Sequence, residues 1–308
     1  MNKQLNFQEM AARWLDYKRP YVRPSTASIY CLHLKTHLIP AFGPLLEIRE
    51  EQVQDWVNRK LDEGLGLKTI KDILLVLKMV LRYGAKQHLT DTYPLDIHFP
   101  TPREDSRPCV LSVAQQRKLM LYLRSHPSLF HLGVALCLQT GLRIGELCAL
   151  TWADLDLCEG VVRVNKTLQR IYVAGWAENS THLQLGTPKT PQSQRVVPLS
   201  RELIAQLRPL KAVHRGGDFF LTGTGSPMEP RGCRRRFQAL QKRLGLPPMR
   251  FHGLRHSFAT RCIESNCDIK TVSALLGHAN IGTTLNFYVH PDLVQKKKCV
   301  EKMNKYIG

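Results

Sequence analysis

Apolar residues recur at three- and four-residue spacing along most of this chain, and the pattern stops for a long stretch between Thr90 and Pro108. Such spacing places apolar side chains on one face of an α-helix. The interruption is rich in proline and charged residues, which are typical of an extended linker. Because 308 residues can form two cores, we expect two domains, at residues 1–90 and 109–308, joined by a linker at 91–108.

The first domain is predicted to be entirely helical. Proline and glycine residues, which end helices, divide it into separate blocks of helical spacing. The blocks cover about residues 6–19, 25–39, 50–63 and 67–87.

The second domain is predicted to be mainly helical with a small antiparallel β-sheet. Helical spacing covers residues 113–125 and 128–140, and it returns from Glu202 to the C-terminus. Between these regions Val and Ile alternate with polar residues at 160–172 and 194–199, as in two short strands joined by a polar loop. The predicted fold class is therefore mainly α, with an all-helical domain followed by an α+β domain.

Basic side chains are concentrated in the second domain. The chain has 44 Lys and Arg against 25 Asp and Glu, and residues 106–308 hold 29 of the basic and 12 of the acidic side chains. This excess favours a surface that binds a phosphate-bearing partner, although any single cluster could be a solvated helix face. One cluster consists of Arg231, Arg234, Arg235 and Arg236, and another of Lys296, Lys297 and Lys298.

No segment predicts a membrane partner. The apolar run at 73–81 is interrupted by Lys78, and the N-terminus has no uninterrupted apolar core of the kind found in signal peptides. Nine cysteines without a CxxC pair are typical of a reducing compartment. We therefore expect a cytoplasmic protein.

The sequence HGLRH is the first candidate for chemistry. If a helix begins at His252, then His252, Arg255 and His256 project from one side of its first turn. Histidine exchanges a proton near neutral pH and arginine keeps its charge, so the pair suits phosphoryl transfer. The alternative is that the histidines cap the helix or pack in a core.

Three further segments hold candidate residues. Arg143 in TGLRIGEL starts a helix, where its guanidinium could face a phosphate while Glu146 holds it; such a pair could also be a surface ion pair. In LLGHANIGTTLNFY, His278 lies at a helix end, and Tyr288 follows ten residues later. Tyr288 could be a nucleophile or a core residue. Lys189 lies in a polar loop, where it could protonate a leaving oxygen or be simply solvated.

Zinc binding is the competing interpretation of some of these residues. The candidate ligand sets are His252, His256, Cys262 and Cys267, and Cys31, His33 and His37. Neither set has the paired CxxC spacing of structural zinc sites, so we expect no metal.

Taken in order, TGLRIGEL, PKTPQSQRVVPL, HGLRH, LLGHANIGTT and the tyrosine ten residues after His278 resemble the motifs of the tyrosine recombinase (phage integrase) family. The resemblance is close over about residues 108–296. The N-terminal helical block resembles the core-binding domain of that family less specifically, and 109–308 would be its catalytic domain.

The resemblance implies a nucleophile and two proton-transfer groups. Tyr288 would attack the scissile phosphate to form a 3′-phosphotyrosyl bond and free a 5′ hydroxyl. His252 would assist proton transfer at the phenol, and Lys189 would be the general acid for the 5′ oxygen. The reaction would need no cofactor, which agrees with the lack of a GxxxxGK[ST] loop or an acidic metal cluster in the sequence.

The resemblance also implies groups that stabilise charge. Arg143 and Arg255 would clamp the non-bridging oxygens, His278 would donate a hydrogen bond to one of them, and Glu146 and His256 would support these side chains. The implied partners are double-stranded DNA recombination sites bound by a homo-tetramer, with an accessory directionality factor as a possible addition. The arginine cluster at 231–236 would contact DNA.

Four functions remain open at this point. The long segment from Tyr172 to Gly186 favours the integrase of a mobile element over an Xer-like resolvase of chromosome or plasmid dimers. A non-catalytic DNA-binding regulator would not need the intact motif set. A type IB topoisomerase uses similar residues, but the helical N-terminal block favours recombination.

Overall fold

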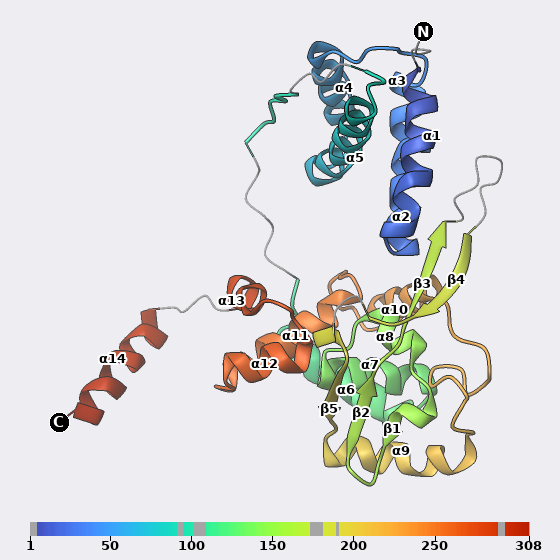
Figure 1. Ribbon diagram of the computed structural model, residues 1–308. Helices are drawn as coiled ribbons and strands as arrows, with labels where there is room; N and C mark the ends of the chain where they lie inside the picture. The colour runs from blue at the N-terminus through green and yellow to red at the C-terminus, as the bar shows by residue number, and fades with distance from the viewer. Residues whose placement is uncertain are drawn as a thin grey trace. The chain divides into compact units, whose positions relative to one another are not determined.

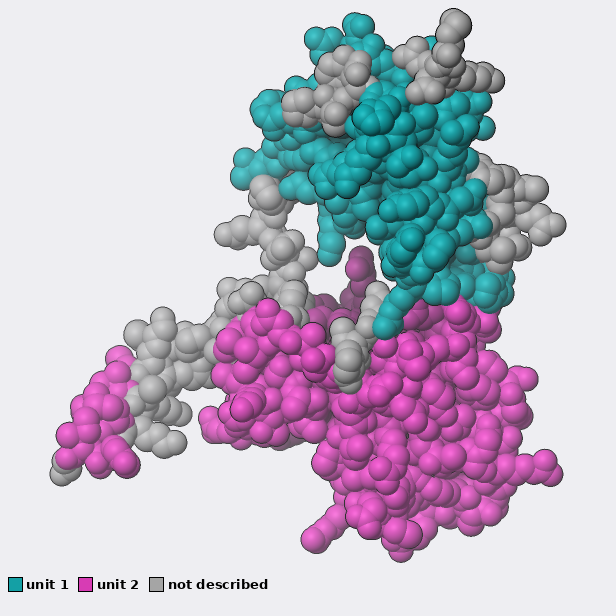
Figure 2. All heavy atoms as spheres, in the orientation of Figure 1, with its two compact units in different colours: residues 1–105, 170–182 teal, residues 106–169, 183–308 magenta. Residues whose placement is uncertain are grey.

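The computed structural model describes residues 5–90, 95–101, 109–172, 181–188, 191–288 and 293–307. The chain divides into two compact units (Figure 2), which consist of residues 1–105 with 170–182, and of residues 106–169 with 183–308. Each unit has an apolar core of its own. No described helix is long and apolar enough to cross a membrane.

The N-terminal unit is built from helices, as the sequence predicts. They are α1 (Phe7–Lys18), α2 (Pro24–His33), α3 (Ile39–Phe42), α4 (Glu50–Asp62) and α5 (Leu67–Lys86), and a π-helical segment at Leu34–Leu38 connects α2 to α3. Asn6 and Glu9 form a capping box that starts α1, with hydrogen bonds in both directions. Figure 1 shows α1 beside α2 and α4 beside α5. Trp14 in α1 and Trp56 in α4 are buried in the core of this unit.

A segment distant in sequence belongs to this unit. The backbone N–H of Tyr172 donates to the hydroxyl of Ser28 at 2.7 Å, and Nζ of Lys35 donates to the hydroxyl of Tyr172 at 3.2 Å. The aromatic ring of Tyr172 packs against the helical core. Residues 170–182 therefore group with the first 105 residues.

The second unit carries most of the helices. They are α6 (Val113–Ser125), α7 (Leu129–Thr140), α8 (Ile144–Ala149), α9 (Arg201–Val213), α10 (Pro230–Arg243), α11 (His252–Glu264), α12 (Ile269–Leu276), α13 (Ile281–Tyr288) and α14 (Leu293–Ile307). Helix α7 is apolar on nearly all sides and buried almost throughout, and α11 packs directly on it. Because α11 packs on this buried helix, the residues at the start of α11 are held against the core of the unit.

The β-structure consists of two small sheets where the sequence predicted one. The first is antiparallel in the order β1 (Leu155–Asp156), β2 (Val161–Val164), β5 (Arg195–Pro198), and Val162 lies opposite Val197. The second pairs β3 (Thr167–Tyr172) with β4 (Thr181–Gly186).

Two details of the strand prediction were wrong. The segment 160–172 is not one strand: β2 and β3 are separate strands in different sheets, and Nζ of Lys166 between them lies 2.8 Å from the carboxylate of Asp154. Strand β4 lies within the stretch predicted as a polar loop. The fold class itself, mainly α with small antiparallel sheets, is confirmed.

Candidate active site

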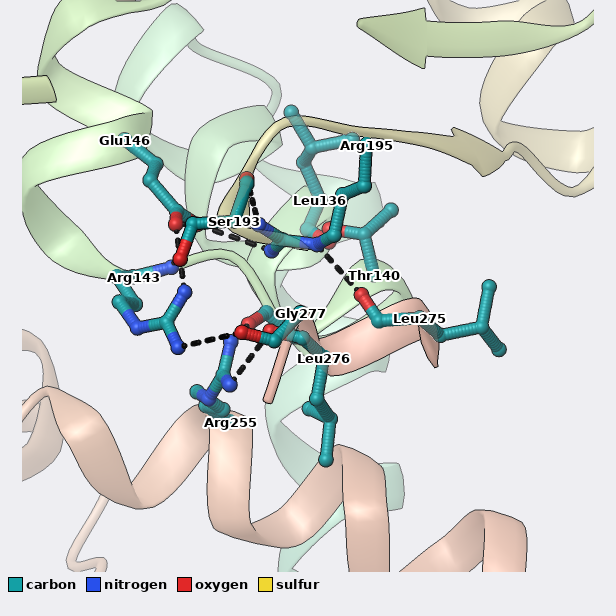
Figure 3. A network of polar contacts seen from close by, with 11 residues as sticks. Leu136, Thr140, Arg143, Glu146, Ser193, Arg195, Arg255, Leu275, Leu276 and Gly277 are labelled. Atoms are coloured by element: carbon teal, nitrogen blue, oxygen red, sulfur yellow. Dashed lines mark hydrogen bonds and ion pairs between the residues drawn. The ribbon is translucent and has the colours of Figure 1, made fainter. Parts of the chain in front are cut away.

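Four separate segments of the second unit meet at the C-terminal end of α12 (Figure 3). Helix α8 begins after Arg143, β5 begins at Arg195, and α11 contributes Arg255 from its first turn. Helix α12 ends at Leu276, and Gly277 follows it in a left-handed conformation.

Glu146 is the acidic centre of this cluster. Its carboxylate is almost fully buried and accepts Nη1 of Arg143 at 2.8 Å, the backbone N–H of Arg143 at 2.9 Å, and Nη1 and Nη2 of Arg195 at 3.1 and 2.9 Å. Burial alone would raise the pKa of Glu146, but the hydrogen bonds and charges of Arg195 and Arg143 hold it below its usual value. Glu146 is therefore an ionised group that orients two arginines.

Three arginines donate to three consecutive carbonyl oxygens at the end of α12. Nε of Arg195 reaches the oxygen of Leu275 at 2.6 Å, Nη2 of Arg255 reaches that of Leu276 at 2.6 Å, and Nη2 of Arg143 reaches that of Gly277 at 3.2 Å. The last carbonyls of a helix have no partners within it and carry partial negative charge. Cationic donors from three segments satisfy them here.

Gly277 is needed for this close approach. Its φ is +63°, and a Cβ atom there would lie 3.0 Å from Cδ of Arg195 and 3.0 Å from the carbonyl oxygen of Gln192. Any other residue would be strained by the positive φ, and its Cβ atom would crowd Arg195.

Arg255 also ties α12 to α7. Its side chain is 1% exposed, and Nη1 donates to the carbonyl oxygen of Gly141, the residue that ends α7, at 2.8 Å. One guanidinium therefore holds two helix ends together. Arg143 differs, because its side chain is 35% exposed.

The two histidines of HGLRH lie on one side of the first turn of α11, as predicted. The rings of His252 and His256 are perpendicular, with centroids 4.7 Å apart. Surrounding protein and the charges of His256, Arg255 and Arg143 lower the pKa of His252 to about 4. Partial burial and the charge of Arg255 likewise lower the pKa of His256. Both rings are accordingly neutral near pH 7.

His278 follows Gly277 at the same helix end. Its Nδ1 lies 2.8 Å from the hydroxyl oxygen of Thr284 in α13. Partial burial and the charges of Arg255 and Arg143 lower the pKa of His278 to about 4, so this ring is also neutral near pH 7.

A cavity of about 360 Å³ opens over this cluster, and its lining includes Arg143, Glu146, Thr167, Gln169, Gly277 and His278. Arg143 and His278 therefore both border the cavity, and the side chain of Arg143 is partly exposed there. Arg255 is buried, and Figure 3 shows its side chain beside Arg143 and Gly277.

The structure brings together most of the residues singled out in the sequence, namely Arg143, Glu146, His252, Arg255, His256 and His278. Lys189 lies outside the described residues. For Tyr288 only the backbone is described, as the last residue of α13.

Arg195 was missed by the sequence analysis. The signal was faint, because a single arginine ahead of Val-Val-Pro-Leu resembles the polar start of any strand. Its partners, Glu146 and Leu275, are 49 and 80 residues away.

Two other sequence-based expectations concern the surface and metal binding. Arg231, Arg234, Arg235 and Arg236 all lie exposed along α10. Within the described parts of the chain, no group of three or more His, Cys, Asp or Glu side chains is placed to hold a metal ion, and this covers both zinc alternatives.

Comparison with known proteins places the chain in a family. Residues 110–293 match the phage integrase family, and residues 6–61 match the N-terminal SAM-like domain of phage integrases. The chain therefore belongs to the phage integrase family, whose members are tyrosine recombinases that cleave and rejoin DNA. The resemblance noted in the sequence is confirmed.

Individual relatives span most of the chain. A tyrosine recombinase XerC-like protein of Caldanaerobacter subterraneus subsp. tengcongensis is 29% identical, over 94% of this chain and 81% of its own length. The transposase from transposon Tn916 of Enterococcus faecalis is 26% identical, over 84% of this chain and 67% of its own. The Tn1549 transposon integrase in complex with a circular intermediate DNA shares the fold, with a TM-score of 0.80, 22% identity, and coverage of 97% and 99% of the two chains.

Proposed function

We propose that this protein is the integrase of a mobile genetic element, which cleaves and rejoins duplex DNA at specific sites through a 3′-phosphotyrosyl intermediate. The observation that carries the chemistry is the arginine and histidine cluster around the end of α12. It offers three guanidinium groups against one carboxylate beside a cavity, which suits the charge that develops on a phosphate during transfer.

The charge-stabilising roles follow from exposure and geometry. Arg143 reaches the cavity and clamps one non-bridging oxygen, while His278 donates a hydrogen bond to another. The family resemblance gives Arg255 the same clamping role, but its guanidinium is buried and donates to the carbonyls of Gly141 and Leu276, so we propose that its poorly screened charge stabilises the phosphate from there. Glu146 fixes the guanidinium of Arg143, and His256 packs against His252.

In the proposed reaction the phenol oxygen of Tyr288 bonds to the scissile phosphorus, and the bond from phosphorus to the 5′ oxygen breaks. The phenol proton passes to His252, which is neutral. The negative charge of a bound phosphate offsets the arginines and raises the pKa of His252 toward the neutral range, which makes it a better acceptor. Lys189 protonates the departing 5′ oxygen, and rejoining follows when a 5′ hydroxyl reverses these steps.

The proposed partners are duplex recombination sites and further copies of this chain. The exposed arginines of α10 contact the DNA backbone, and residues 1–90 serve as the core-binding domain with residues 109–308 as the catalytic domain. As the family resemblance implies, four copies assemble on two sites, with room for a directionality factor. We expect the reaction to take place in the cytoplasm.

The nucleophile can be tested with a nicked duplex that carries the DNA flanking the gene, incubated in EDTA and analysed on a denaturing gel. Wild-type protein and Tyr306→Phe should form a covalent adduct, because Tyr306 is 92% exposed on α14 and matches Tyr288 in chemistry. Tyr288→Phe should form none. An adduct with Tyr288→Phe, or none with wild type on DNA that it binds, would contradict the proposal.

The mobile-element role has one specific competitor, since the XerC-like relative matches 94% of this chain. A plasmid that carries the gene with its flanking DNA separates the two roles. An integrase should release a circle bounded by short repeats on either side of the gene. A resolvase should instead convert plasmid dimers carrying one internal site into monomers, and a type IB topoisomerase should relax supercoiled DNA that carries no site.

A further inference from the structure

His278 has a buried partner that its proposed role does not explain. The hydroxyl oxygen of Thr284 lies 2.8 Å from Nδ1 of His278, and Thr284 is 0% exposed. Thr284 lies within α13, and the histidine lies six residues earlier, just past the end of α12. The contact therefore joins the loop that carries His278 to the helix that ends at Tyr288.

The direction of this hydrogen bond follows from what a buried hydroxyl needs. A neutral imidazole has one N–H donor and one acceptor nitrogen, so either group could in principle donate. Among the described residues, the hydroxyl of Thr284 has no other hydrogen-bonding partner. If Nδ1 of His278 donated, the O–H of Thr284 would be buried without an acceptor, and an unpaired buried donor is costly.

The donor is therefore the O–H of Thr284, and the acceptor is Nδ1. In a neutral ring the single proton must then reside on Nε2, on the opposite edge of the imidazole. The neutral form is the relevant one, because partial burial and the charges of Arg255 and Arg143 lower the pKa of this ring.

We propose that Thr284 is a positioning residue that fixes His278 in the tautomer with its proton on Nε2, so that His278 presents an N–H donor to the cavity. This inference rests on the proposed function for its catalytic consequence, although the tautomer itself does not depend on it. A ring with its proton on Nδ1 would offer a lone pair to a negatively charged phosphate oxygen, which repels it. Thr284 thereby decides whether His278 assists or opposes the developing charge.

The matched variants are Thr284→Val, which keeps the shape and removes the hydroxyl, and Thr284→Ser, which keeps the hydroxyl. Thr140→Val is the control for loss of a buried hydroxyl, because the hydroxyl of Thr140 is equally buried and donates to the carbonyl oxygen of Leu136 at 2.6 Å. Single-turnover cleavage should slow at least about tenfold in Thr284→Val. Complete loss of one oxyanion donor typically lowers the rate constant about 10²- to 10³-fold, and the variant loses only the control of the tautomer. Thr284→Ser and Thr140→Val should stay within about threefold of wild type.

A spectroscopic measurement tests the tautomer directly. Long-range ¹H–¹⁵N spectra of the full chain labelled on histidine distinguish the two tautomers, and the His278→Gln variant assigns the signal. Wild type and Thr284→Ser should show His278 with its proton on Nε2, and Thr284→Val should show the other tautomer or a mixture.

The inference is overturned if wild-type His278 carries its proton on Nδ1, or if Thr284→Val keeps both the wild-type tautomer and the wild-type rate. If Thr284→Val does not fold, wild type and Thr284→Ser still decide the tautomer. A wild-type protein that shows the expected tautomer but forms no covalent adduct would leave Thr284 as the positioning group and contradict the proposed function alone.

Discussion

Removing Arg195 should destabilise the second unit more than any surface arginine does. The substitution Arg195→Met keeps most of the apolar stem and deletes the guanidinium, which donates twice to Glu146 and once each to Leu275 and Ser193. The pair is buried, with side chains 5% and 3% exposed. Among the described residues, Glu146 then keeps Arg143 as its one charged partner in the interior.

The expected loss in the free energy of unfolding depends on Arg143, which still pairs with Glu146 in the variant. Breaking a buried ion pair from one side typically costs about 3–5 kcal/mol, because an uncompensated charge remains. Arg143 still donates to Glu146 through its side chain and its backbone N–H, so we expect the lower end, about 3 kcal/mol. For a unit of this size that corresponds to a decrease in Tm of about 6–12 °C.

Urea denaturation followed by circular dichroism measures the free energy of unfolding, and calorimetry measures Tm. The control is Arg163→Met in β2 of the same unit, because Arg163 pairs with Asp156 at 3.1 Å on the surface, with side chains 52% and 31% exposed. That variant should lose at most about 1 kcal/mol. Equal losses in the two variants would refute the reasoning. Adding Glu146→Gln to Arg195→Met should recover part of the loss, since the stranded charge is then gone.

Further predictions concern the chemistry and its pH dependence. Arg143→Ala should slow cleavage about 10²- to 10³-fold while duplex affinity in a filter-binding assay changes little, because the clamp acts on transition-state charge; parallel loss of binding would contradict this. Lys189→Ala should regain cleavage on a substrate with a 5′-thio leaving group, which needs no general acid, and absence of rescue would remove Lys189 from that role. His278 has a folded-state pKa of about 4, below its usual 6.5, so the unfolded chain binds its proton first and stability should fall as pH drops from about 6.5 to 4. His278→Gln should reduce the dependence of the free energy of unfolding on pH over this range. If urea titrations at several pH values show the same dependence in the variant and in wild type, the pKa of His278 is not lowered.

Part of the site was predictable because its residues lie at helix ends, where sequence signals are strong. Arg143 and Glu146 are three residues apart at the start of α8, so their pairing follows from helix geometry. His252 and Arg255 likewise lie three residues apart in the first turn of α11, so their projection from one side of that turn follows from helix geometry. Their grouping with His278 came from the family resemblance.

The remainder depends on contacts between segments far apart in sequence. No spacing links Arg195 to Leu275, 80 residues away, because the connection exists only after β5 and α12 pack together. Strand β4 escaped detection for another reason: its side chains are exposed or partly exposed without alternation, so it lacks the period that marks a half-buried strand. The grouping of residues 170–182 with the N-terminal unit likewise depends on single contacts such as that of Tyr172 with Ser28.

The row of carbonyls at Leu275, Leu276 and Gly277 lets the site keep its dimensions while the chain around it changes. Each arginine donates a hydrogen bond to the same helix end, so its guanidinium is positioned by that contact as well as by its own segment. Insertions or deletions between the motifs therefore alter the connections without altering the distances between the guanidinium groups. We therefore expect a change in loop length to be tolerated more readily than a side chain at Gly277, where a Cβ atom would crowd Arg195.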